Sequence, residues 1–364
     1  MEGLGMTCGP WSNVRVLVTG HTGFKGSWLT LLLTALGADV CGYALAPTTS
    51  PSLFEAARVS DVCRSEIGDI RDRSKFASVV RAFRPEVVFH LAAQAIVRAS
   101  YRDPVETYST NVMGLITVLE VLRESPSARQ ILNITSDKCY ENREWAWGCR
   151  ETDPMGGFDP YSSSKGCAEL ITASWRRSFF APNGVNLASA RAGNVIGGGD
   201  WAEDRLLPDF VRAIAAGQEL LIRSPRATRP WQHVLEPLAG YVRLAEGLMK
   251  GGSHLADGWN FGPAMESVRD VEWIARRLCE LWGDKARMRV AEDASFHEAR
   301  NLMLDSSKAR VELGWRPIWT VEQAVKRIVD WYQLHFAGED ARGLCMRDIE
   351  AYRQELELSQ RRSA

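Results

Sequence analysis

The chain lacks the features that mark membrane, secreted and nucleic-acid-binding proteins. It contains no run of about 18 apolar residues, so no membrane-spanning helix is expected. Its first residues show no basic stretch followed by an apolar one, so no secretory signal is expected. The formal net charge is −1 over 364 residues, which leaves no basic field to hold nucleic acid or an anionic membrane. Any bound anion must therefore be held by local groups.

Clustered cysteines are also missing. The eight cysteines form no CxxC pair, and no Cys/His cluster has the spacing of a zinc site, so no metal is expected. Reduced thiols in a cytoplasm are the simplest interpretation. The remaining composition, 45% hydrophobic and 24% charged, is that of a globular protein with room for one large domain and a smaller one.

What is present is a regular alternation of strands and helices in the first half. Short apolar runs over 14–18, 87–91 and 130–134 are typical of buried strands, and the longest helical patterns cover 107–122 and 162–179. This alternation predicts an α/β fold with a doubly wound parallel sheet.

The pattern loosens after Asn194, where glycines and prolines divide the chain into short pieces. We expect a dinucleotide-binding domain over residues 12–195, completed by strands that return from the C-terminal half. A smaller substrate-binding lobe is expected over residues 196–336. Residues 337–364 are polar and charge-rich, and they predict a terminal helix or a loose tail.

A glycine-rich loop follows the first predicted strand and opens the first predicted helix. Gly20, Gly23 and Gly26 are spaced GxxGxxG. Glycine is needed there because the backbone must turn sharply and let a diphosphate approach the free N–H groups of the helix. The loop therefore predicts a bound dinucleotide.

The choice between NAD and NADP stays open in the sequence. An acid that binds the adenosine ribose is expected about 20 residues after the loop. The second strand ends at Tyr43-Ala44-Leu45-Ala46, with neither an acid nor an arginine. Lys25 is a candidate for a 2′-phosphate contact, or a solvated loop lysine. Asp69 follows a further short segment and is a candidate for an adenine contact.

A Tyr-Lys pair stands at the start of the helical pattern over 162–179. Tyr161 and Lys165 are four residues apart, so both side chains lie on one face of a helix. An ammonium near a phenol favours the phenolate, which lets tyrosine act as a general base. Ser136 precedes the pair at the end of a predicted strand.

Together, these motifs resemble the extended branch of the short-chain dehydrogenase/reductase superfamily, which has a Rossmann-like fold. The segments 90–94 (HLAAQ), 111–114 (NVMG) and 191–195 (RAGNV) extend the resemblance. It implies that Ser136, Tyr161 and Lys165 form the catalytic triad. The residues that the resemblance places against the cofactor, NAD with NADP not excluded, are Gly20, Thr22, Gly23, Phe24, Gly26, Asp69, Ile70, Leu91, Ala92, Ala93, Gln94, Asn111 and Lys165.

The residues after Ser136 narrow the family. Asp137 and Lys138 stand where the nucleotide-sugar 4,6-dehydratases commonly carry Asp-Glu. The Asp-Lys version, with the segments 191–201 and 229–234, is most similar to dehydratases of CDP-linked glucose. The resemblance implies a nucleotide-diphosphate hexose as substrate, Asp137 as the acid, and Lys138 in place of the usual glutamate base. The implied substrate-binding residues are Gln94, Asn194, Arg229 and Asn260.

Several alternatives stay open. Lys138 is either the C5 base or a group that orients water or substrate, because an adjacent Asp–Lys pair in water favours the wrong charge state for both roles. A nucleotide-sugar 4-epimerase is the nearest other activity, and a non-catalytic dinucleotide-sensing protein on the same fold is a further one. The resemblance also implies a homodimer or homotetramer built on the two long helices.

Overall fold

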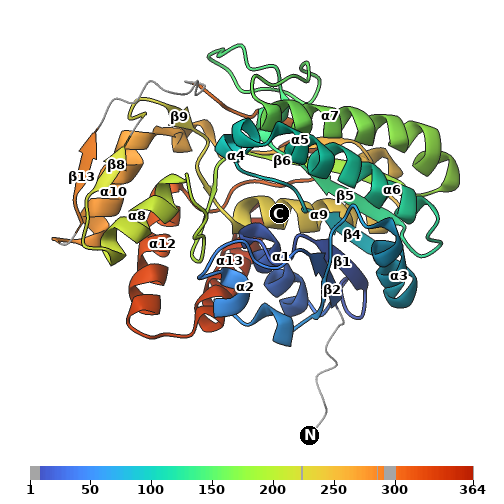
Figure 1. Ribbon diagram of the computed structural model, residues 1–364, viewed down its shortest axis with the longest axis horizontal. Helices are drawn as coiled ribbons and strands as arrows, with labels where there is room; N and C mark the ends of the chain where they lie inside the picture. The colour runs from blue at the N-terminus through green and yellow to red at the C-terminus, as the bar shows by residue number, and fades with distance from the viewer. Residues whose placement is uncertain (1–8, 223, 285, 291–300, 364) are drawn as a thin grey trace, which may run out of the picture.

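The centre of the molecule is a parallel sheet of seven strands in the order β11-β6-β5-β4-β1-β2-β3. The computed structural model describes residues 9–222, 224–284, 286–290 and 301–363 (Figure 1). The strands are β1 (Arg15–Thr19), β2 (Asp39–Ala44), β3 (Arg64–Ile67), β4 (Val87–His90), β5 (Gln130–Ile134), β6 (Asn186–Ala192) and β11 (Gly258–Phe261). The predicted α/β fold with a doubly wound parallel sheet is confirmed.

Helices cover both faces of this sheet because its strands are apolar on both sides. In β1, Val16 and Val18 belong to one apolar cluster and Leu17 to another, as expected when successive side chains point to opposite faces. One face is covered by α3 (Arg73–Phe83), α6 (Leu115–Arg123) and α7 (Pro160–Trp175), and the other by α1 (Phe24–Ala35) and α9 (Leu235–Met249), with α13 (Ala341–Ser363) packed on the outside of α1.

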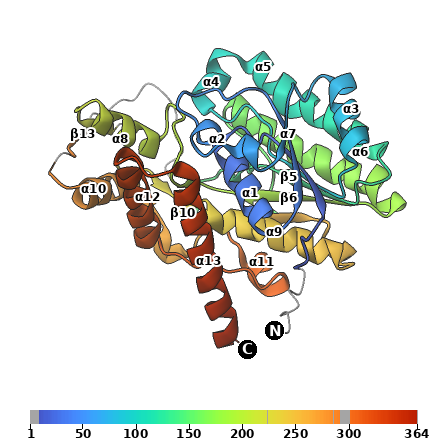
Figure 2. The same ribbon diagram turned by 90° about the horizontal axis from the view of Figure 1, so that it is seen from below.

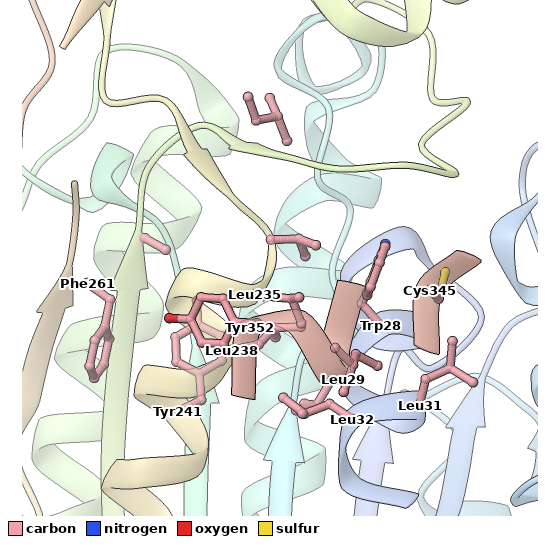
Figure 3. Packing of buried hydrophobic residues seen from close by; sticks show 14 of the residues in the cluster. Trp28, Leu29, Leu31, Leu32, Leu235, Leu238, Tyr241, Phe261, Cys345 and Tyr352 are labelled. Carbon is pink, nitrogen blue, oxygen red and sulfur yellow. The ribbon is translucent and has the colours of Figure 1, made fainter. Parts of the chain in front are cut away.

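The chain end is a helix packed on the core. Apolar side chains of α1, α9 and α13 interdigitate in Figure 3, with Trp28, Leu238 and Tyr352 among them. All three are at most 3% exposed. Figure 2 shows α13 lying beside α1 and passing the start of α9. Of the two expectations for residues 337–364, the terminal helix is therefore observed.

The smaller lobe lies to one side of the sheet (Figure 1, left). It contains α8 (Leu206–Ala215), α10 (Val271–Trp282), α12 (Val321–Phe336), and the short strands β7 (Val195–Ile196), β8 (Leu220–Ile222), β9 (Thr228–Arg229), β10 (Gln232–His233), β12 (Arg269–Asp270) and β13 (Met288–Val290). Its apolar residues join those of α1 and α9 in one cluster. The division of the chain at residues 195 and 336 remains a prediction. Two elements inside those bounds belong to the larger domain: β11 is a strand of the main sheet, and α9 packs on that sheet.

The remaining helices are α2 (Leu53–Ala56), α4 (Val97–Arg102), α5 (Pro104–Tyr108) and α11 (Ser307–Glu312). The helix predicted over 107–122 is interrupted by a π-helical turn, Ser109–Gly114, between α5 and α6. In the part of the chain that the structure describes, no helix has the length and apolar character needed to cross a membrane.

Candidate active site

A cavity of about 1660 Å³ opens at the carboxyl ends of the strands. The strand order reverses between β1 and β4, and ligands of open α/β sheets bind at that crevice. The lining combines the glycine loop, the ends of β2 to β6 and the inner surface of the smaller lobe. Its volume exceeds that of an ordinary ligand pocket, and so has room for two nucleotides.

The glycine loop leaves space for a diphosphate at only one of its three glycines. A Cβ on Gly20 would lie 2.8 Å from the amide nitrogen of Ala92, and a Cβ on Gly26 would lie 2.1 Å from the carbonyl oxygen of Gly20. A Cβ on Gly23 would meet only that same oxygen, at 3.4 Å. Gly23 is exposed to the cavity and precedes the free N–H groups of α1. The loop therefore fits a dinucleotide diphosphate at Gly23.

The end of β4 forms the opposite wall of this subsite. Thr19 accepts hydrogen bonds on its Oγ1 from the amides of Leu91 and Ala92, both at 3.2 Å. Asn111 lies behind the wall: its Oδ1 accepts from the Gln94 amide at 2.8 Å, and its Nδ2 donates to Ser164 Oγ at 2.9 Å. Asn111 therefore holds the wall against α7 without lining the cavity. The other expected cofactor contacts that line it are Thr22, Phe24, Asp69, Ile70, Ala93 and Gln94.

The predicted triad is brought together. Ser136 ends the segment after β5, and Tyr161 and Lys165 lie in the first turns of α7, whose N-terminus is capped by Asp159. All three line the cavity and are at most 8% exposed. Burial raises the pKa of Tyr161 to about 12, although the Ser136 hydroxyl partly lowers it. Burial lowers the pKa of Lys165 to about 8, so its ammonium still predominates at pH 7.

Asp137 and Lys138 form a short 3₁₀ turn beside the triad. Ser136 Oγ donates to Asp137 Oδ1 at 2.9 Å and accepts from the Lys138 amide at 3.2 Å. Asp137 is 2% exposed, and its Oδ2 has no hydrogen-bond partner among the described residues. Burial raises the pKa of Asp137, against the lowering effect of the Lys138 charge. The turn therefore carries a carboxyl group with an increased tendency to be protonated.

The predicted substrate residues divide into two groups. Gln94, Asn194 and Arg229 line the cavity. Asn260 does not: its side chain is fully buried, accepts from Tyr140 Oη at 2.7 Å and donates to the carbonyl oxygen of Cys149 at 2.8 Å. Its placement gives no support to the expected substrate contact, because its amide is already used inside the protein.

Two cationic residues lie at the sugar end: Arg205, which the sequence did not mark, and Lys25, which the sequence left as a 2′-phosphate contact or a solvated loop lysine. Arg205 stands at the start of α8, forms an ion pair with Asp200 at 3.0 Å, and lies near enough to Tyr161 to lower its pKa. Lys25 is half-buried, with its Nζ 5.8 Å from the ring centroid of Tyr241, and interacts electrostatically with Asp137. Lys25 is therefore neither a solvated loop lysine nor placed for a 2′-phosphate. No local motif marks Arg205; only the folded lobe brings it here.

Comparison with known proteins agrees with this geometry. The family model described as GDP-mannose 4,6 dehydratase matches residues 17–328. A CDP-glucose 4,6-dehydratase from Salmonella typhimurium is 53% identical over 347 residues, covering 94% of this chain and 97% of the relative. A dTDP-glucose 4,6-dehydratase from Neisseria gonorrhoeae is 28% identical, covering 87% of this chain and 95% of that protein.

Solved structures share the fold. The dTDP-glucose 4,6-dehydratase DesIV from Streptomyces venezuelae, solved with NAD and TYD bound, has a TM-score of 0.77 at 23% identity and covers 90% of this chain and 100% of its own. The UDP-glucose 4-epimerase of Thermus thermophilus, solved in complex with NAD, has a TM-score of 0.76 at 24% identity, with 88% and 99% covered. At these identities, the likeness establishes only the Rossmann-like fold of the extended short-chain dehydrogenase/reductases. The family model and the Salmonella relative go further, and they show that the chain belongs to the nucleotide-sugar 4,6-dehydratase family, a family of hydro-lyases.

Proposed function

We propose that the chain converts CDP-glucose to CDP-4-dehydro-6-deoxyglucose and water, with NAD as cofactor. The observation that carries the proposal is the buried Asp137 carboxyl, placed beside Tyr161 in one cavity and with a raised pKa. A 4-epimerase needs no such acid, whereas a dehydratase must protonate a departing hydroxyl. The identity to the Salmonella enzyme supports the choice of nucleotide.

Tyr161 is the proposed base for the 4-hydroxyl proton. The Lys165 ammonium, 6.0 Å from the centroid of the tyrosine ring, favours the phenolate, and the Ser136 hydroxyl acts in the same direction. When bound, the nicotinamide supplies the oxidising capacity at C4 and returns the reducing equivalent at C6. The chain itself must therefore orient the sugar and move protons.

Asp137 and Lys138 serve the elimination in this proposal. The 4-ketone acidifies the C5 proton, a base removes that proton, and Asp137 protonates the 6-hydroxyl, which leaves as water. An adjacent Asp–Lys pair in water favours a charged carboxylate, which cannot act as an acid. Burial favours the protonated form of Asp137 and so makes the carboxyl able to donate a proton. Lys138 is half-buried on the same turn and is proposed either as the C5 base or as a group that orients water or substrate.

NAD is proposed over NADP because two cations that line the cavity, Arg71 and Lys25, are engaged elsewhere. Arg71 donates to Asp69 at 2.7 Å and to Glu106 at 2.7 Å, and Lys25 reaches the sugar end. A 2′-phosphate would need one of these cations to change partner. Relatives solved with NAD support the same choice.

The sugar diphosphate is proposed to lie between Arg229 and Arg205. Both residues line the cavity, and each is oriented by a contact within the protein: Arg229 donates to the carbonyl oxygen of Thr228 at 2.9 Å, and Arg205 pairs with Asp200. A planar guanidinium suits a phosphate because it donates in two parallel directions.

A homodimer that forms through the α5–α7 layer is also proposed, and a homotetramer is the alternative. This layer exposes large apolar side chains on neighbouring elements, and contiguous patches of this kind mark interfaces. The residues are Val105, Met113, Leu170 and Phe179, with exposures of 77, 56, 61 and 39%.

A cytoplasmic location is proposed from the seven described cysteines, all of them free thiols.

The test is incubation of the purified chain with CDP-, dTDP- and GDP-linked hexoses, followed by mass spectrometry. The proposal predicts a product lighter by one water from CDP-glucose, and much slower or no turnover of the other two. An isomer of unchanged mass would identify an epimerase, and no product from any hexose would favour a sensing role.

A further inference from the structure

A buried polar network borders the cavity and has no step in the proposed chemistry: Tyr140 lines the cavity, and Arg191 and Asn260 lie behind it. Tyr140 Oη accepts a hydrogen bond from Arg191 Nη1 at 2.5 Å and donates one to Asn260 Oδ1 at 2.7 Å. The three residues are 1, 5 and 0% exposed. They come from the segment after β5, from β6 and from β11, so the network crosses three neighbouring parts of the sheet.

The charge of Arg191 is balanced by Glu169 on α7. Arg191 Nη2 and Glu169 Oε2 are 2.7 Å apart, and Ser189 Oγ donates to the same oxygen at 2.7 Å. Thr135 Oγ1 donates to the other carboxylate oxygen. Burial acts to raise the pKa of Glu169, but Arg191 and these donors outweigh it and lower the pKa, so the carboxylate stays charged.

These contacts hold both ends of the turn that carries the proposed acid and base. Thr135 precedes Ser136 and is bound by Glu169, while Tyr140 follows the Asp137–Cys139 turn and is bound by Arg191. Glu169 lies one helical turn beyond Lys165 on the helix that also carries Tyr161. One ion pair thus links the turn to the catalytic helix.

The far side of the network is fixed as well. The Asn260 amide nitrogen Nδ2 donates to the carbonyl oxygens of Cys149 at 2.8 Å and Asp305 at 3.1 Å, and its backbone amide donates to Glu151 Oε1 at 2.9 Å. Tyr140 therefore cannot shift without breaking contacts on two sides. The guanidinium of Arg191 also lies 5.1 Å from the centroid of the Tyr140 ring.

Stability alone does not account for such a network. A buried ion pair is often no better for stability than well-packed apolar residues, because removing both charges from water is costly. Its geometric effect is specific, since a catalytic group displaced by about 1 Å can lose about 100-fold in rate. We propose that Tyr140, Arg191 and Glu169 are positioning residues that fix the Asp137–Lys138 turn relative to Tyr161, and thereby control the elimination step. The proposal rests on the proposed function, which gives that turn its role.

The test follows the C5 proton of the 4-keto-6-deoxy nucleotide product in D₂O, using the full chain with NAD. Exchange of this proton for deuterium needs a base at C5 but no oxidation at C4, so it follows proton removal separately from hydride transfer. Tyr140→Phe keeps the ring and removes the hydroxyl. We expect exchange and dehydration to slow together by about 10- to 100-fold, with KM for CDP-glucose nearly unchanged.

Tyr352→Phe is the matched control. It also removes one buried hydroxyl, which donates to Glu236 Oε2 at 2.7 Å far from the turn, and we expect a comparable loss of melting temperature with unchanged exchange. Thr135→Val, nearly isosteric, releases the other end of the turn and keeps the test valid where Tyr140→Phe does not fold. A folded Tyr140→Phe or Thr135→Val variant with the wild-type exchange rate would overturn the proposal.

Asp137→Asn and Lys138→Ala, measured alongside, separate this failure from that of the proposed function. Wild-type exchange and dehydration in both would remove the turn from the chemistry, whatever Tyr140 does. Slow reactions in either one, with Tyr140→Phe at the wild-type rate, would leave the proposed function standing and reject only the positioning network.

Discussion

The two ends of the cavity are built by different means. At the dinucleotide end, the shape of the backbone dominates: Gly20 and Gly26 permit close packing of β1, β4 and α1, and Gly23 leaves the open space. At the sugar end, ionisable side chains dominate, with Asp137 and Lys165 both buried and both shifted in pKa. The surface that only binds is thus made mainly of main chain, and the surface that must move protons is made of side chains.

This difference indicates that the dinucleotide end determines cofactor binding and that the sugar end determines the rate of the reaction. Backbone N–H groups at a helix start recognise a diphosphate in any nucleotide. Burial and neighbouring charges tune a proton donor for one reaction. Substitutions at the sugar end should therefore change turnover, and substitutions at the dinucleotide end should change binding.

The largest effect is expected for Tyr161→Phe. Loss of the proposed general base should lower kcat by about 10²- to 10⁴-fold, while NAD binding and the melting temperature stay near those of the wild type. Steady-state kinetics with calorimetry of NAD binding would separate the two quantities. A comparable weakening of NAD binding would contradict the division between the two ends.

Gly23→Val is expected to act at the other end. A Cβ at this position would meet only the Gly20 carbonyl oxygen at 3.4 Å, so the chain should fold, and the valine methyl groups should fill the space for the diphosphate. Loss of one or two charge-assisted hydrogen bonds predicts NAD binding weaker by about 100-fold or more. Gly9→Val, where a Cβ meets nothing within 4 Å, is the control, and calorimetry that finds equal affinities in both would remove the loop from the site.

A smaller effect is expected for Arg205→Ala. Removing a guanidinium from the sugar diphosphate should raise KM for the nucleotide sugar by about 10- to 100-fold and change kcat less, since a hydrogen bond to a charged group contributes about 1.5–3 kcal/mol. Arg316→Ala, at an exposed position, is the control. An unchanged KM, with NAD affinity reduced instead, would place Arg205 at the wrong end of the cavity.

The smallest effect on turnover is expected for Glu236→Gln, which lies outside both ends. Burial raises the pKa of Glu236 to about 7 from 4.5, although the amides of Ile318 and Trp319 and the Tyr352 hydroxyl oppose this. The folded state thus holds a proton that the unfolded state releases. Stability is fully present below about pH 4.5 and is lost as pH rises through about 7, by about 3 kcal/mol.

The variant should remove this slope. Denaturant unfolding at pH 5 and pH 8 should show the wild type losing stability over that interval relative to Glu236→Gln. Parallel curves for the two proteins would mean that the carboxyl is ionised in the folded state at pH 5.

The sequence predicted the residues of the dinucleotide end more completely than those of the sugar end. The glycine loop is contiguous and its geometry is local, so its residues could be placed from their spacing. Tyr161 and Lys165 lie on one helix, so their placement on a common face could also be predicted from their spacing. Arg205 was missed and Lys25 was given other roles, because the directions of both side chains depend on how the lobe packs against the sheet. The resemblance implied contacts for Asn111 and Asn260, but tertiary hydrogen bonds turn both inward.

The C-terminal helix could have been predicted with more certainty. Leu344, Cys345, Ile349 and Tyr352 recur at helical spacing and are all buried in the apolar cluster that also contains α1, α9 and α12. The high charge of the segment obscured this narrow apolar stripe. By contrast, the π-helical turn Ser109–Gly114 could not be predicted, because a single turn inside a longer helix is too short to change the hydrophobic periodicity of the segment.

The central claim is tested most directly by CDP-glucose carrying deuterium at C4. The proposed dehydratase should give a product lighter by one water, with the label at C6 of the same molecule. Label that returns to C4 of an epimerised sugar, with no loss of water, would contradict the account of the sugar end and leave the fold and the glycine loop unaffected.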